Sequence, residues 1–166
     1  MSHVKSKLLF LCTGNSCRSQ MAEGWTRTMW GERIEAYSAG LETHGLNPSA
    51  VLVMAEAGVD ISTQRSKRVD EFLDTKFDLV ITVCAHAYET CPVFSGGAKV
   101  IHAGFDDPPK LAESVETKDA KLDCYRRVRD QIRAFVKTLP DLLNHSAQDA
   151  DRMSRKYKDS NDACKP

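Results

Sequence analysis

The sequence predicts an α/β fold, with a four-stranded parallel sheet flanked by helices on both faces. Short apolar runs of strand length alternate along the chain with stretches of helical periodicity. The run "FDLVITV", residues 77–83, is almost unbroken in its apolar and β-forming character, which is typical of a strand covered on both faces. Right-handed connections between parallel strands place the intervening helices on both faces of such a sheet.

The first strand and the first helix form one strand-helix unit. We predict the strand over Lys7–Cys12 and the helix over about Ser19–Trp30, just before Gly31. A second strand is predicted over Arg33–Ala39. Because its apolar positions follow directly on the end of the first helix, the connection between the two strands passes through that helix.

The second helix has start and stop signals that agree. Asn47 is a favoured cap, Pro48 suits the first turn, and Gly58 closes the helix. The run at residues 77–83 then gives the third strand, and Lys99–His102 gives a short fourth strand.

A long helix is predicted near the end of the chain. Apolar residues recur at helical spacing over Lys118–Leu139, so that one face can cover the sheet, and Pro140 ends or kinks this helix. A length of 166 residues is usual for one globular domain. We therefore expect a single α/β domain over residues 1–145 and a polar, loosely ordered tail over residues 146–166.

Composition excludes several classes of function. The 23 basic and 23 acidic residues balance, so no net field attracts nucleic acid or an anionic membrane. The apolar run Leu8–Leu11 is too short for a signal-peptide core or a membrane span, and we expect a cytoplasmic monomer. Reducing cytosol disfavours structural disulfides, so the six cysteines become candidates for catalytic, redox or metal roles. A zinc site would recruit His86 or His102, but no close cysteine pair has zinc-finger spacing.

The segment Cys12–Arg18 has the character of an oxyanion-binding loop. It joins a strand to a helix N-terminus, where backbone N–H groups and the helix dipole favour an anion. Gly14 permits close backbone approach, Asn15 can fix the loop through its side chain, and Arg18 offers a bidentate fork to a tetrahedral oxyanion. The same positive field is expected to lower the pKa of Cys12 and populate its thiolate. The predicted oxyanion-binding residues are Thr13, Gly14, Asn15, Ser16, Cys17, Arg18 and Ser19.

Two further segments are expected to meet this loop. Ligands of parallel α/β sheets bind at the carboxyl ends of the strands. Cys12 ends the first strand, Cys84 follows the third, and the "DDPP" segment, residues 106–109, follows the fourth. All three are therefore predicted to lie at one edge of the sheet.

The loop "CTGNSCRS", together with Asp107-Pro108, resembles the low-molecular-weight tyrosine phosphatase family. The resemblance covers nearly the whole chain up to the tail and implies the strand order 2-1-3-4. It also implies that Cys12 is the nucleophile, that Arg18 clamps the transition state and that Asp107 protonates the leaving group. Asp106 competes for the last role, and the family pattern favours Asp107.

The sequence departs from the phosphatases in three places. Pro109 and Lys110 follow the Asp-Pro pair, where phosphatases have an aromatic residue that lines the phosphotyrosine pocket. The loop ends "RSQ" rather than Arg-Ser-Pro. The stretch "VCAHAYETCPVFSGG" places Cys84 and Cys91 seven positions apart beside the nucleophile's edge of the sheet. This stretch and the longer motif "CTGNSCRSQMAEGW" resemble the thioredoxin-coupled arsenate reductases, which share the phosphatase fold.

The resemblance implies an arsenate reductase that uses three cysteines in turn. Cys12 attacks arsenate with help from Asp107. Cys84 then attacks Cys12 and releases arsenite, and Cys91 resolves the disulfide. Because seven helical positions span roughly 10 Å and a disulfide needs Cα atoms within roughly 7 Å, the segment between Cys84 and Cys91 must unwind. Reduced thioredoxin supplies the electrons, and no bound cofactor is expected.

Two alternatives remain open at this point. A phosphatase that hydrolyses phosphate monoesters through a Cys12 phosphoenzyme would not need Cys84 or Cys91. A non-catalytic thiol protein would bind arsenite or a metal. Packing or surface placement is the simpler interpretation of three other cysteines, Cys17, Cys124 and Cys164.

Some reductases of this family hold a potassium ion near the loop. Asn15, Glu23 and Ser38 stand where its oxygen ligands would be. Lys67, however, occupies a place where potassium-binding members have an acidic residue. We therefore expect the Lys67 ammonium to substitute for the ion, and no metal to be required.

Overall fold

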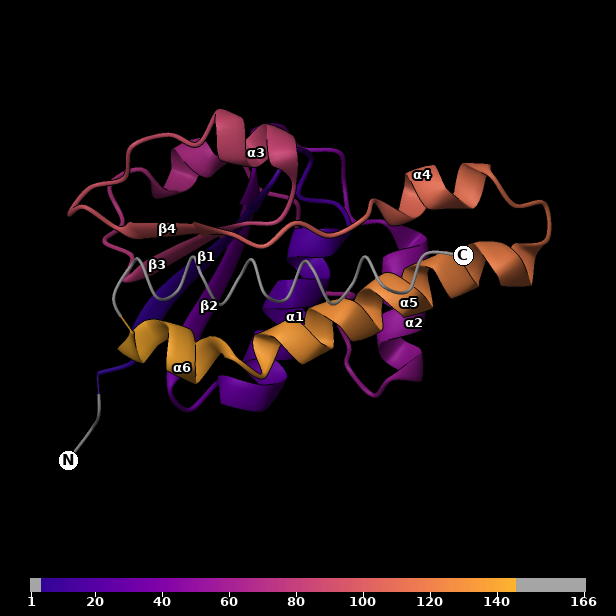
Figure 1. The fold of residues 1–166 in the computed structure, drawn as a ribbon, viewed down its shortest axis with the longest axis horizontal. Coiled ribbons are helices and arrows are strands. Elements are labelled where there is room, and N and C mark those ends of the chain that lie inside the picture. Colours follow the sequence, from indigo (N-terminus) through magenta and orange to yellow (C-terminus); the bar gives the residue numbers. More distant parts are fainter. Residues whose placement is uncertain (1–3, 146–166) are drawn as a thin grey trace.

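The computed structural model describes residues 4–145, and the predicted tail, including Cys164, lies outside them. The strands are β1 (Ser6–Cys12), β2 (Ile34–Gly40), β3 (Leu79–Thr82) and β4 (Lys99–His102). The helices are α1 (Arg18–Trp30), α2 (Pro48–Glu56), α3 (Ala85–Glu89), α4 (Pro108–Glu113), α5 (Lys118–Val136) and α6 (Leu139–Asn144), with a short 3₁₀-helix, η1 (Val69–Phe72). The strands form one parallel sheet in the order β2-β1-β3-β4 (Figure 1), which confirms the predicted fold class and strand order.

Strand β1 runs through the middle of the sheet and is buried on both faces. Leu8 pairs with Ala36 of β2 on one side and with Leu79 of β3 on the other. Residues 8–11 are completely buried, and removing this apolar surface from water is a main source of the fold's stability. The sheet thereby holds Cys12, the last residue of β1, in a fixed position.

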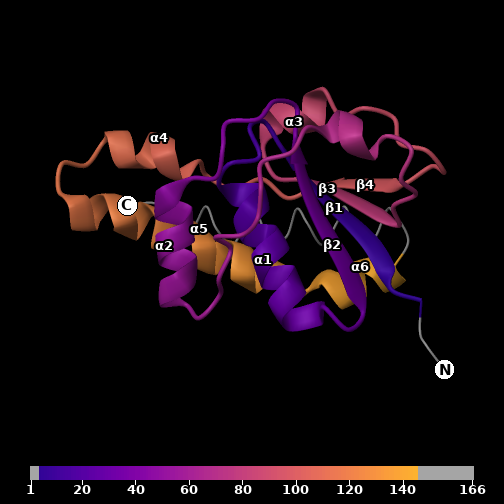
Figure 2. The ribbon, with the colours of Figure 1, turned by 180° about the vertical axis from the view of Figure 1, so that it is seen from behind.

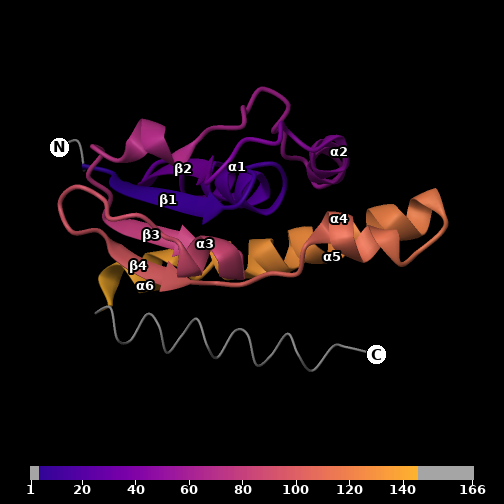
Figure 3. The ribbon, with the colours of Figure 1, turned by 90° about the horizontal axis from the view of Figure 1, so that it is seen from above.

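Helices cover both faces of the sheet. α1 and α5 pack side by side on one face, and α3 lies on the other (Figure 1, Figure 2). α4 packs against α5 beyond the sheet (Figure 3). No helix within residues 4–145 is long and apolar enough to cross a membrane. The buried side of α5 has the helical spacing predicted from the sequence and consists of Tyr125, Val128, Ile132, Phe135 and Val136.

The end of the long helix differs from the prediction. α5 ends at Val136, and Pro140 lies in the first turn of a separate helix, α6. A proline fits a first helical turn because the N–H that it lacks would have no partner there. The same rule accounts for α4, which begins at Pro108 in a segment where the sequence predicted no helix.

The predicted signals of α2 are confirmed. Asn47 Oδ1 accepts hydrogen bonds from the backbone N–H groups of Ser49 and Ala50, at 2.9 and 3.1 Å. Gly58 has a φ of +81°, in the left-handed region that glycine adopts readily at the end of a helix.

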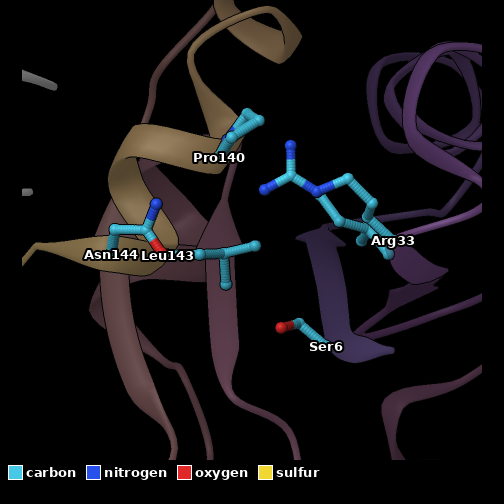
Figure 4. Close-up of a pocket in the computed structure, with 6 residues that line it drawn as sticks. Ser6, Arg33, Pro140, Leu143 and Asn144 are labelled. Carbon is cyan, nitrogen blue, oxygen red and sulfur yellow. The ribbon is translucent and has the colours of Figure 1, made fainter. Parts of the chain in front are cut away.

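A small hollow lies at the amino ends of the strands (Figure 4). Ser6 begins β1 and Cys12 ends it, so this hollow is at the opposite edge of the sheet from the predicted site. Its lining residues are Ser6, Arg33, Ile34, Pro140, Leu143 and Asn144.

Candidate active site

The oxyanion loop, residues 12–18, joins β1 to α1 as predicted. Its outer side is covered by residues 41–47, the segment that leaves the end of β2. Because the loop carbonyls are satisfied from outside, the loop can turn its N–H groups inward, as in an anion-binding nest. The four backbone bonds run from Leu41 N to Cys12 O (3.2 Å), Glu42 N to Thr13 O (2.9 Å), His44 N to Gly14 O (2.9 Å) and Asn47 N to Ser16 O (3.0 Å).

The side chain of His44, a residue that the sequence did not single out, occupies the space that a side chain at position 14 would need. A Cβ atom at this position would lie 2.3 Å from Nδ1 of His44, far inside contact distance. Nε2 of His44 lies 2.9 Å from Oε2 of Glu42. The close approach at Gly14 in this structure is that of the His44 ring, and the approach of the Gly14 backbone to an oxyanion stays a prediction. No motif around His44 identifies it as a neighbour of Gly14.

Asn15 fixes the centre of the oxyanion loop. Its φ of +46° lies in the left-handed region, which costs a residue with a side chain roughly 1–2 kcal/mol. The buried side chain compensates: Nδ2 donates to the hydroxyl oxygens of Ser19 and Ser38, at 2.9 Å each. Its Oδ1 accepts from the backbone N–H of Lys67 at 2.8 Å. The predicted role of Asn15 in fixing the loop is confirmed.

Arg18 and Asp107 lie together beside the loop. Nη1 of Arg18 donates to the carbonyl oxygen of Phe105 at 3.0 Å, and Nη2 lies 3.4 Å from Oδ1 of Asp107. Nε of Arg18 is buried and has no hydrogen-bond partner among the described residues, so it is available to a bound anion. Asp106 faces Arg127 instead, at 3.8 Å. The structure therefore places Asp107, and not Asp106, beside Arg18, and the role of Asp107 as the acid stays a prediction.

Cys84 is the second thiol at this edge of the sheet. It is buried, as Cys12 is, and its Sγ lies 3.3 Å from the Thr13 hydroxyl. A hydrogen bond from Cys12, with help from Thr13, lowers the pKa of Cys84 to about 5. The same contact, followed by burial, raises the pKa of Cys12 well above its ordinary value. The two thiols are therefore coupled: they share a proton through this hydrogen bond, and its loss belongs to the pair rather than to either sulfur alone.

The expected lowering of the Cys12 pKa is wrong for this arrangement. Arg18 does lower the pKa of Cys12, but the hydrogen bond with Cys84 and burial outweigh it. The lowered pKa of Cys84, to which a backbone hydrogen bond from Ala87 also contributes, favours the thiolate on Cys84 over the thiolate on Cys12. The sequence predicted that Cys12 and Cys84 lie at one edge of the sheet, but it did not predict that the hydrogen bond between them outweighs Arg18.

The Cys84 thiolate should disappear on acidification. Because its pKa is lowered to about 5, the charged form predominates above that pH and is protonated below it. Ultraviolet thiolate absorbance of the folded protein is therefore expected to fall as the pH drops through about 5. In Cys12→Ala the largest cause of the lowering is gone, and the midpoint should move to higher pH. An unchanged midpoint in this variant would contradict the shared proton.

Cys91 lies just beyond the C-terminal end of α3. Its side chain is half-buried, which raises its pKa, and its Sγ lies 3.6 Å from the carbonyl oxygen of Pro92. α3 has five residues and separates Cys91 from Cys84. Its exposed Tyr88 ring stacks on His102, with 4.8 Å between the ring centroids. A helix this short has few internal hydrogen bonds to lose when it unwinds.

The remaining described cysteines have the surroundings of packing residues. Burial raises the pKa of Cys17 to about 12, so this thiol stays protonated. Cys124 is half-buried on α5 and donates to the carbonyl oxygen of Ala120 at 3.4 Å. Among residues 4–145, no group of three or more His, Cys, Asp or Glu side chains is arranged to hold a metal ion.

A buried ammonium lies where the sequence suggested a cation. Nζ of Lys67 donates to the carbonyl oxygen of Arg65 at 2.6 Å and lies 3.7 Å from Oε2 of Glu23. The Ser38 hydroxyl donates to the same carboxylate. Burial lowers the pKa of Lys67, and Glu23 opposes that effect. A potassium ion would have to displace this side chain, so these residues do not fit a resident ion.

The fold and the loop define the family of this chain. Residues 7–149 match the family described as low molecular weight phosphotyrosine protein phosphatase. Because this match covers most of the sequence, the chain belongs to that family.

Relatives within the family are named arsenate reductases. One from Halalkalibacterium halodurans is 50% identical over 137 residues, which cover 82% of this chain and 96% of the relative. One from Bacillus subtilis is 49% identical over 130 residues, with coverage of 78% and 91%. A solved structure described as an arsenate reductase in oxidized state matches with a TM-score of 0.69 and 30% identity, over 83% of this chain and 98% of that one.

Proposed function

We propose that this chain is an arsenate reductase, which converts arsenate to arsenite. The observation that carries the proposal is that two buried thiols, Cys12 and Cys84, lie beside the oxyanion loop, with the Cys84 sulfur 3.3 Å from the Thr13 hydroxyl of that loop. Hydrolysis of a phosphate ester needs one nucleophilic thiol, whereas reduction needs a second thiol within reach of the first. The names of relatives at about half identity support the same activity.

In the first step, Cys12 attacks arsenate held by the loop N–H groups and Arg18. As the sulfur–arsenic bond forms, the Cys12 proton passes along the hydrogen bond to the Cys84 thiolate. An arsenic–oxygen bond breaks, and its oxygen leaves as water after taking a proton from Asp107. Arsenic is still As(V) at this stage, because no electron pair has moved onto it.

In the second step, Cys84 attacks the sulfur of Cys12. Its proton passes to an oxygen bound to arsenic, and the Thr13 hydroxyl, 3.3 Å away, stabilises the attacking thiolate. The disulfide bond forms and the sulfur–arsenic bond breaks. The bonding electron pair leaves with arsenic, which becomes As(III) and departs as arsenite.

In the third step, Cys91 restores the nucleophile. It attacks the sulfur of Cys84 while α3 unwinds, its proton passes to Cys12, and a Cys84–Cys91 disulfide results. A reduced dithiol protein of the thioredoxin class then reduces this disulfide and is itself oxidised. Such coupling is consistent with a cytoplasmic protein, and the expected monomeric state stays a prediction.

The test of this proposal is arsenate-dependent NADPH consumption with thioredoxin and thioredoxin reductase. Turnover should require arsenate, this chain and thioredoxin together, and each is omitted in turn as a control. A chain that consumes no NADPH but hydrolyses a chromogenic phosphate monoester would be a phosphatase instead.

Potassium should leave the rate of arsenate reduction unchanged. The Lys67 ammonium already supplies the buried positive charge beside Oε2 of Glu23, and Arg27 pairs with Oε1 at 2.6 Å, so exchanging sodium for potassium at constant ionic strength adds nothing. In Lys67→Met the carboxylate of Glu23 loses that partner, and potassium should then raise the rate. Stimulation of the unmodified chain by potassium would contradict this interpretation of Lys67.

A further inference from the structure

Gln20, the third residue of α1, ties the oxyanion loop to a distant part of the chain. Its side chain is completely buried. Nε2 lies 3.0 Å from the carbonyl oxygen of Asn15, 3.0 Å from Oδ1 of Asn15 and 2.9 Å from the carbonyl oxygen of Arg65. One amide group thus faces three acceptors, and two of them belong to Asn15.

These contacts act on the strained residue of the loop. Asn15 has its φ at +46°, and a conformation of this kind persists only where the surroundings over-determine it. Gln20 holds the main chain and the side chain of Asn15 at the same time. Without those bonds Asn15 can relax toward negative φ, and the peptide groups on either side of it would rotate away from the inward arrangement.

Gln64 holds Gln20 from the other side. Nε2 of Gln64 donates to Oε1 of Gln20 at 2.8 Å and to its carbonyl oxygen at 3.0 Å. This donor fixes the orientation of the Gln20 amide, with its oxygen toward Gln64 and its nitrogen toward Asn15. The Arg65 carbonyl oxygen accepts hydrogen bonds from both Gln20 and Nζ of Lys67. The Gln20 amide and the buried ammonium are therefore held by the same acceptor.

We propose that Gln20, oriented by Gln64, is a positioning residue that preorganises the oxyanion loop for tetrahedral oxyanions. This inference rests on the proposed function, because arsenate is a tetrahedral oxyanion. It concerns the binding of the anion and not the reactions of the three thiols. If only a fraction of the molecules have the loop in the binding-competent conformation, the apparent Kd for the anion is the intrinsic Kd divided by that fraction. We expect Gln20 to keep nearly all molecules in the binding-competent loop conformation.

The decisive variant is Gln20→Met, which has similar length but no donor or acceptor. The Kd for inorganic phosphate, measured by calorimetry, should rise about tenfold, as expected when buried hydrogen bonds are lost and acceptors are left unpaired. The KM for arsenate should rise by a similar factor. Because saturating anion selects the competent loop, kcat should change by less than about threefold.

Thr26→Val is the matched control on the same helix. Thr26 is completely buried, as Gln20 is, and its hydroxyl donates to the Ala22 carbonyl at 2.8 Å. This variant should leave the phosphate Kd unchanged, because it removes a buried hydrogen bond of α1 that does not reach the oxyanion loop. Gln64→Met is the second variant and should raise the Kd about threefold. Because Gln64 acts through Gln20, the double variant should bind phosphate no more weakly than Gln20→Met alone.

A phosphate Kd within about twofold of the native value in both glutamine variants would overturn the proposal. If Gln20→Met does not fold, the phosphate Kd of Gln64→Met alone tests the proposal, and a value within about twofold of the native one overturns it. Phosphate binding requires neither arsenic nor thioredoxin. A chain that binds phosphate as described but reduces no arsenate would therefore refute the proposed function and leave this inference intact.

Discussion

Replacing Cys84 with serine is expected to abolish arsenate reduction while sparing hydrolysis of phosphate monoesters. Serine cannot form a disulfide, so the arsenic bound to Cys12 cannot leave with the electron pair and can only return to arsenate. The loss should be at least about a thousandfold, as is usual for removal of a nucleophile. Serine cannot accept the Cys12 proton, but it also removes the Cys84 hydrogen bond and charge that raise the Cys12 pKa, while Arg18 still lowers that pKa. Cys12 can then attack as its own thiolate, so the first chemical step is retained.

Both activities of Cys84→Ser are measured in parallel, by NADPH consumption and by release of a chromogenic alcohol. Cys124→Ser is the matched control, because Cys124 is a half-buried thiol on α5, outside the oxyanion loop and α3. It should change neither rate. Persistent reduction by Cys84→Ser would refute the three-cysteine relay, and loss of hydrolysis would show that the attack by Cys12 also needs Cys84.

Changing Arg18 to lysine is expected to lower kcat/KM by roughly 10²–10⁴-fold, for reduction and for hydrolysis alike. The guanidinium donates to the Phe105 carbonyl through Nη1 and keeps Nε for the anion. An ammonium is a single point charge and cannot do both. Arg18 also lowers the pKa values of Cys12 and Cys84, and a displaced charge would weaken that effect.

Arg127→Lys provides the comparison for Arg18→Lys. Arg127 is exposed and lies 3.8 Å from Asp106, so its loss should alter kcat/KM by less than about fivefold, in line with the small effects of surface ion pairs. If Arg18→Lys retained activity comparable with Arg127→Lys, the guanidinium would not be the group that holds the oxyanion.

The parts of the fold that the sequence predicted correctly depend on local signals. Leu8–Leu11 form an apolar run of strand length, and Asn47, Pro48 and Gly58 mark both ends of α2 within a few residues. The edge that gathers Cys12 and Cys84 follows from parallel topology, because successive strands then end on the same side. The break between α5 and α6 was missed because the apolar pattern continues to Leu139 across it.

Side-chain contacts between distant segments were not predictable in this way. The His44 ring against Gly14 and the bond from Gln64 to Gln20 each join residues that no periodicity or motif relates. The Cys12 pKa illustrates the consequence. The sequence predicted positive surroundings for Cys12 and placed Cys84 at the same edge of the sheet. The direction of the Cys12 pKa shift depends on the hydrogen bond between the two thiols, which the sequence does not specify.

The four backbone bonds between residues 41–47 and the oxyanion loop also limit how the chain can vary. Most of this segment is exposed, and an exposed connection ordinarily accepts insertions and deletions. Here one added or removed residue would move the N–H groups of residues 41–47 away from the loop carbonyls to which they donate. It would also displace Asn47, which caps α2. This surface connection is therefore as fixed in length as a strand in the middle of the sheet.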